Sequence, residues 1–190
     1  MDGKRTGGPH VSGLGPLGER RAALGIPMSA VASRIGVSIQ RICDWEAWAR
    51  IPGREGGRSL WNAKASTAMA YAHALDCKLD GLMAGVPVDP RLGDSERELL
   101  RGAAEGRAFP DGDGGSLAEF MERSGVDTSA LSEASGLSRQ NISRWLRWRA
   151  GGAVSSAVDP SCMRVVSLCR LAAALGVSMD SLAAGLASAR

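Results

Sequence analysis

The sequence has few of the residues from which enzymes and metalloproteins build their sites. It contains two histidines and four cysteines in 190 residues, and no two cysteines form a Cys-X-X-Cys pair. Zinc sites need several such ligands at short spacing. The glycine-rich stretches at 7–18 and 111–115 are not set between a strand and a helix, as a phosphate-binding loop would be. We therefore expect no metal, no cofactor and no enzymatic activity, and cysteines that are reduced and buried.

Long apolar runs are absent too. No stretch approaches the ~18 apolar residues of a membrane span, and the N-terminus lacks the apolar core of a signal peptide. We therefore expect a cytoplasmic protein without membrane contact. The net charge of +3 neither proves nor excludes a nucleic-acid partner.

An internal repeat decides the expected organisation. Shifted by one hundred positions, residues Leu17–Gly85 align with Leu117–Gly185 without a gap, and eighteen positions are identical. Chance agreement at ordinary composition is about one position in fifteen. The identical pairs include Gly25/Gly125, Gly36/Gly136, Ser38/Ser138, Gln40/Gln140, Ile42/Ile142, Trp45/Trp145, Trp48/Trp148, Leu75/Leu175, Asp80/Asp180, Leu82/Leu182 and Gly85/Gly185.

The repeat predicts two domains, at 17–86 and 117–190. A disordered tail over 1–16 precedes them, and a linker over 87–116 joins them. In the linker, Ser95–Glu98 reads as a capping box that starts a short helix ending near Glu105, before a loop at Phe109–Ser116. Arg20, Arg21 and Arg101 are expected to be solvated.

Each copy has the pattern of an all-α, five-helix domain. Apolar residues recur at spacings of three and four, and period-two alternation is absent. In the first copy we expect helices over 17–24, from Pro27 to Ile35, from Ser38 onward, over 65–75, and a short one with Leu79, Leu82 and Met83 inward. Turn glycines should end the first two helices, and N-caps are expected at Ser38, Asp127 and Ser138. Ile42 and Trp45 should face the core, and Trp48 and Trp148 should lie in the core or an interface.

Two segments carry a resemblance. MSAVASRIGVSIQRICDWE (28–46) and TSALSEASGLSRQNISRWL (128–146) share a small residue, a turn glycine, a serine cap, then Ile and Trp three apart. They resemble the helix-turn-helix of Cro/repressor-type (lambda-repressor-like) regulators of bacteria and phages. The downstream segments AHALDCKLDGLMAG and AAALGVSMDSLAAG are similar to the closing helices of that family. The resemblance implies two tandem lambda-repressor-like domains, whose third helices enter the major groove of double-stranded DNA, and a nucleoid-associated location.

The resemblance also implies the DNA-contacting residues. In the second copy, arginine can contact guanine and glutamine can contact adenine, while neighbouring arginines reach phosphates. The implied residues of this copy are Ser138, Arg139, Gln140, Asn141, Ser143, Arg144, Arg147 and Arg149. In the first copy they are Ser38, Ile39, Gln40, Arg41, Asp44, Arg50 and Arg54, with Arg58 and Lys64 as further phosphate contacts. Ile39 can touch a thymine methyl, and Asp44 can accept from cytosine.

The two reading faces differ, which favours a division of labour. We expect the second copy to read sequence and the first to add affinity, orientation or weaker readout, at an asymmetric or imperfectly repeated site. The two copies can form a covalent pseudo-dimer on one site, or each chain can form a homodimer on a longer one. The alternative is a protein-interaction module or an antitoxin, because Cys43 and Asp44 in the first copy also suit a protein partner.

Overall fold

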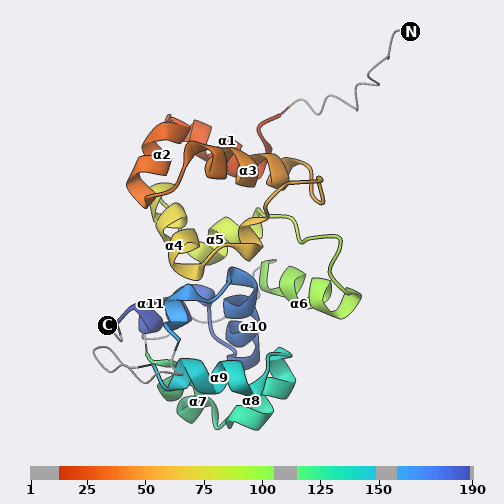
Figure 1. Ribbon diagram of the computed structural model, residues 1–190, viewed down its shortest axis with the longest axis vertical. Coiled ribbons are helices and arrows are strands. Elements are labelled where there is room, and N and C mark those ends of the chain that lie inside the picture. The colour runs from red at the N-terminus through yellow and green to blue at the C-terminus, as the bar shows by residue number, and fades with distance from the viewer. Residues whose placement is uncertain (1–12, 105–114, 149–157, 189–190) are drawn as a thin grey trace.

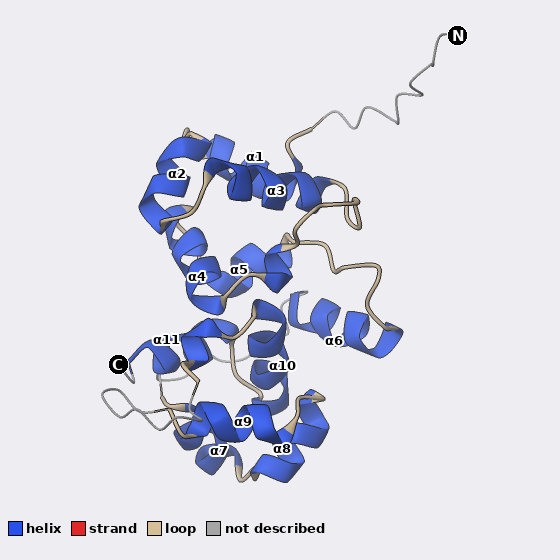
Figure 2. Ribbon diagram, in the orientation of Figure 1, coloured by secondary structure: helices blue, strands red, loops and turns tan. Residues whose placement is uncertain are grey.

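The computed structural model describes residues 13–104, 115–148 and 158–188, and over these ranges the chain is all helical, with no strand. Eleven α-helices and two short 3-10 helices occur in the described residues (Figures 1 and 2). The first repeat contains α1 (Gly15–Ala23), α2 (Met28–Ile35), α3 (Ile39–Arg50), η1 (Leu60–Asn62), α4 (Ala65–Ala74) and α5 (Leu79–Ala84). The second contains α7 (Leu117–Ser124), α8 (Thr128–Ser135), α9 (Arg139–Leu146), η2 (Pro160–Cys162), α10 (Val165–Leu175) and α11 (Met179–Ser188), and α6 (Asp94–Ala104) lies between them.

The first helix starts earlier than the sequence predicts. Gly15 and Pro16 already belong to α1, so the prediction of a disordered tail over 1–16 is wrong for its last two residues. Proline suits the first turn of a helix, where its missing N–H needs no partner. Pro27, expected as the first residue of α2, is instead its N-cap. Residues 1–12 lie outside the described part of the chain.

The turn that joins α2 to α3 forms as predicted, and it is the same in both repeats. Gly36 and Gly136 have φ values of 69° and 65°, a left-handed conformation that glycine adopts without strain. The Ser38 and Ser138 hydroxyls accept from the N–H groups three residues on, and Asp127 caps α8 in the same way. These caps fix where α3 and α9 begin, and so which side chains they expose.

The core of each repeat lies under the turn. Ile42 and Ile142 are fully buried, as predicted, and so is Trp48. Trp45 is buried, whereas its counterpart Trp145 is only half-buried. The pattern did not predict η1, which buries Trp61 and directs its indole N–H to the Pro87 carbonyl at 3.0 Å.

The two repeats pack directly against each other. In Figure 1, α2 and α4 lie on the left of the upper half, and their counterparts α8 and α10 lie on the right of the lower half. At the junction the backbones of Lys64 and Arg164 form an antiparallel bridge. The N–H of Ala65 donates to Met163 at 2.8 Å, and the N–H of Val165 donates to Ala63 at 3.0 Å. The repeats therefore form a pseudo-dimer within one chain.

Two aspartates repeat this symmetry at the starts of α5 and α11. The Asp180 carboxylate accepts from the N–H groups of Leu79 and Asp80, at 2.8 and 2.9 Å. The Asp80 carboxylate accepts from the N–H groups of Met179 and Asp180, at 3.2 and 3.0 Å. Each repeat thus caps a helix of the other with a charge-assisted bond. Burial, and the neighbouring Asp180 carboxyl, raise the pKa of Asp80 to about 6.

The expected linker helix exists as α6, but it is part of the packed structure. It starts at Asp94, so Ser95 lies in its first turn and the predicted Ser95–Glu98 capping box is wrong. Its Leu100 is fully buried, and Glu96 forms an ion pair with Arg170 of α10. A capping box does form further on, where Ser116 and Glu119 start α7. Residues 105–114, which include most of the expected loop, lie outside the described segments.

None of the described helices is long and apolar enough to cross a membrane alone. The bent pair Val165–Leu175 and Met179–Gly185 passes that test only when the two are taken together, by length and composition.

Candidate nucleic-acid interface

Most of the predicted site residues lie on α3 and α9 or at the ends of these helices. On α9, Ile142 is buried and the rest of the face is open: Ser138, Arg139, Gln140, Asn141, Arg144 and Arg147 are exposed and Ser143 is half-buried. On α3, Ser38, Ile39 and Gln40 are exposed, and Arg41, Cys43 and Asp44 are half-buried. Arg149 lies outside the described residues.

The α9 face is rich in hydrogen-bond donors. The guanidinium groups of Arg139 and Arg144 carry positive charge along it, with the side-chain amides of Gln140 and Asn141 between them. Guanidinium groups match the two acceptors of a guanine edge, and amides match adenine. Arg147 follows directly after α9, at its C-cap. This surface has the chemistry to contact both base edges and phosphates.

The α3 face has different chemistry at the equivalent positions. The Gln40 amide Nε2 donates to Asp44 Oδ1 at 2.9 Å, so these two side chains hold each other along the helix. Beside them a cavity of about 230 Å³ is lined by residues of α3 and of the loop that follows: Gln40, Cys43, Asp44, Ala47, Arg54, Glu55, Gly56 and Gly57. A carboxylate stands where α9 carries Arg144, so the two faces cannot recognise the same groups.

The basic residues expected to contact phosphate around α3 do not all lie at its face. Arg41 is on the helix, and Arg54 and Arg58 are exposed in the loop after it. Arg50 ends α3 and donates to the Gly13 carbonyl at 3.3 Å. The backbone of Lys64 pairs with Arg164, which places Lys64 at the junction between the repeats.

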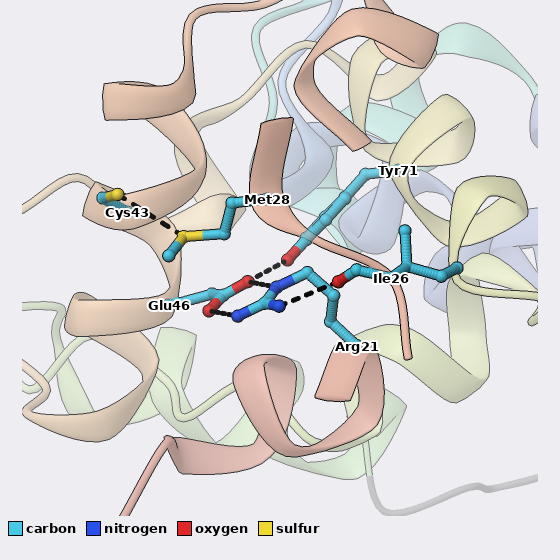
Figure 3. A network of polar contacts seen from close by, with 6 residues as sticks. All are labelled: Arg21, Ile26, Met28, Cys43, Glu46 and Tyr71. Atoms are coloured by element: carbon cyan, nitrogen blue, oxygen red, sulfur yellow. Dashed lines mark hydrogen bonds and ion pairs between the residues drawn. The ribbon is translucent and has the colours of Figure 1, made fainter. Parts of the chain in front are cut away.

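A buried ion pair supports α3 from behind (Figure 3). Arg21 of α1 donates to both oxygens of Glu46, at 2.6 and 2.9 Å, and to the Ile26 carbonyl at 2.9 Å. The Tyr71 hydroxyl donates to Glu46 at 3.5 Å. The bond to Glu46 raises the pKa of Arg21 above its ordinary value, and burial, with the Glu46 charge, raises the pKa of Tyr71. The network ties α1, α3 and α4 together and fixes how α3 is presented.

The sequence reasoning missed this network, since Arg21 was expected to be solvated. Arg20 is indeed exposed, although its guanidinium group donates to the Leu75 and Asp76 carbonyls at the end of α4, at 3.1 and 3.2 Å. The repeat itself contained the missing signal. The positions that align with Arg21, Glu46 and Tyr71 are apolar in the second copy, where Met121, Leu146 and Leu171 stand. Apolar residues at all three aligned positions are compatible with a buried cluster at this place in both repeats.

Comparison of the chain with models of known protein families, with curated proteins and with solved structures finds no match. Among the described residues no group of three His, Cys, Asp or Glu side chains could hold a metal ion. The fold and surface together define an all-α protein of two helical repeats, each of which exposes a helix immediately after a glycine turn.

Proposed function

We propose that this protein is a sequence-specific, double-stranded DNA-binding transcription regulator of the lambda-repressor-like type, in which α3 and α9 enter the major groove. The observation that carries the proposal is the α9 surface. A serine-capped helix behind a left-handed glycine exposes Arg139, Gln140 and Arg144 together, over a buried Ile142. Such a helix fits the major groove with its first turns at the base edges.

The pseudo-dimer supports a particular mode of binding. The contacts between the repeats are reciprocal, as in a symmetric dimer, and α3 and α9 lie in opposite halves of the molecule (Figure 1). Paired helix-turn-helix units read half-sites about one helical turn, ~34 Å, apart. One chain therefore takes the place of a homodimer. Since Arg139 and Arg144 align with Ile39 and Asp44, the two half-sites differ in sequence.

Selection of bound duplexes from a random pool, followed by sequencing, tests the proposal. We expect one asymmetric site per chain, with two half-sites at a fixed spacing. Arg139→Ala and Arg144→Ala should each weaken the selected site about 5- to 150-fold and relax the preference at one base. Arg101→Ala removes an exposed charge from α6 and serves as the control, with little effect expected.

Salt dependence gives a second readout. Binding should weaken steeply as salt rises, with a slope of about −0.9 per phosphate contacted. A strict palindrome bound by one chain, or an unchanged selected sequence after Arg139→Ala and Arg144→Ala, contradicts the proposal.

A second candidate function has its own support. The α3 face carries the exposed Ile39 and the Asp44 carboxylate, which suit a protein surface better than a phosphate backbone. On this alternative the first repeat grips a protein, as in an antitoxin, and the α9 face alone meets DNA. A co-purifying protein, together with a selected duplex that contains only the half-site of α9, favours this alternative; failure to bind any duplex at low salt favours a protein-interaction module without a DNA site.

A further inference from the structure

The outward face of α3 has an apolar column, Ile39 and Cys43, beside a polar column, Gln40 and Asp44. Ile39 and Cys43 lie one helical turn apart, and Gln40 and Asp44 lie one turn apart next to them. Ile39 is 50% exposed, so it is open to an apolar contact from outside the molecule. Cys43 Sγ contacts Met28 Sδ at 3.5 Å, so α2 widens the apolar column at its base (Figure 3).

A hydrogen bond between Gln40 and Asp44 fixes how these two side chains lie on α3. Gln40 Nε2 donates to Asp44 Oδ1 at 2.9 Å, which leaves Asp44 Oδ2 to accept from another group. An ionised carboxylate can only accept hydrogen bonds. None of positions 39, 40, 43 and 44 is basic, whereas the aligned positions on α9 include Arg139 and Arg144. Because Asp44 holds one N–H of the Gln40 amide, the groups that α3 offers a base pair are an apolar contact, the Asp44 carboxylate acceptor and the rest of the Gln40 amide.

Few base edges complement the apolar contact and the carboxylate acceptor together. In the major groove the apolar group is the methyl on C5 of thymine, and donors are the amino groups of cytosine and adenine. A cytosine methylated at C5 presents a methyl and an amino donor on the same base. Guanine presents two acceptors in the major groove, which would repel Asp44.

We propose that α3 recognises a 5-methylpyrimidine, thymine or 5-methylcytosine, through Ile39, Cys43 and Met28, while Asp44 accepts from a neighbouring exocyclic amino group. The inference rests on the proposed function, and it assigns the first repeat a specificity opposite to that of the second. The half-site of α9 is read through purine acceptors, and the half-site of α3 through pyrimidine methyl groups.

The test uses the full chain and the duplex that the selection yields. Each thymine is replaced in turn by uracil, which removes only the methyl, and each cytosine by 5-methylcytosine, which adds only the methyl. Fluorescence anisotropy then gives the dissociation constant of each duplex. At one or more positions in the half-site covered by the first repeat, loss of the methyl group should raise the dissociation constant about fourfold. This is the effect expected when one methyl-sized apolar group is no longer buried. The uracil and 5-methylcytosine arms distinguish which pyrimidine supplies it.

In Ile39→Ala the ratio of dissociation constants between duplexes with and without the methyl group should fall to near unity. Arg139→Ala should weaken binding to both duplexes and leave that ratio unchanged. Ile51→Ala, which truncates another exposed isoleucine at the end of α3, is the matched control and should leave it unchanged. Specific duplex binding that is indifferent to every methyl in this half-site, or that keeps the full discrimination in Ile39→Ala, overturns the inference alone. Absence of any duplex binding overturns the proposed function as well.

Discussion

Replacing Arg21, Glu46 and Tyr71 with the residues of the second repeat, as Arg21→Met, Glu46→Leu and Tyr71→Leu, tests what the buried ion pair contributes. In the single variant Arg21→Met the Glu46 carboxylate, whose side chain is 8% exposed, keeps only the Tyr71 hydroxyl at 3.5 Å. Leaving a buried charge without its partner costs about 3–5 kcal/mol of the free energy of unfolding. Glu46→Leu should cost a similar amount, because it leaves the Arg21 guanidinium group unpaired.

The triple variant should recover most of that loss. A buried ion pair and a well-packed apolar cluster of similar volume are often close in stability, and the second repeat already folds this cluster as Met121, Leu146 and Leu171, of which Leu171 is fully buried. We expect a free energy of unfolding within about 2 kcal/mol of the natural protein.

Urea unfolding followed by circular dichroism measures these differences, and the slope of the transition shows whether cooperativity is retained. Met121→Arg in the second repeat is the reciprocal control, and it should destabilise as strongly as Arg21→Met. A triple variant as unstable as the sum of its single variants, or an Arg21→Met variant within about 1 kcal/mol of the natural protein, refutes the reasoning.

Two further predictions concern the junction and a close approach of the backbone. The raised pKa of Asp80, about 6, means that the folded state holds this proton more tightly than the unfolded state, so its stabilising contribution is present below about pH 4 and lost as pH rises through 6. Asp80→Asn should therefore gain stability relative to the natural protein between pH 4 and pH 7.5, by about 1 kcal/mol once solvent screening of this partly exposed carboxyl is allowed for. Urea titrations at each pH measure the gain, and a constant difference across that range would contradict it. Gly185→Ala should lower the melting temperature, because its Cβ would overlap the Gly115 backbone, whereas Gly85→Ala should be tolerated, since its Cβ meets nothing nearer than Pro16 Cβ at 3.4 Å. Equal thermal shifts in the two variants would contradict that explanation.

Local features could be predicted from the sequence because their causes are local. Ser38, Asp127 and Ser138 cap their helices through bonds that span three residues, and Gly36 turns the chain through its own φ. Repetition at a fixed offset strengthened each of these assignments, and the exposed positions of α3 and α9 followed from the caps by helical periodicity.

Long-range contacts could not be predicted in this way. Arg21 and Glu46 are 25 residues apart, and neither shows in its own neighbourhood that it is buried. Asp80 and Asp180 were visible as an identical pair, but their roles depend on how two repeats meet, about which the pattern within each repeat says nothing. For α6 the pattern predicted a helix but not the Glu96–Arg170 pair that seats it against α10.

The junction at Lys64 and Arg164 also has a consequence for how such a protein evolves. In an assembly of two identical chains every mutation appears twice, so both ends change together, and dilution separates the partners. Here the partners cannot drift apart at low copy number, and a substitution in α3 leaves α9 untouched. Each end of the molecule is free to change without the other, and the equivalent positions 39 and 139 hold Ile and Arg.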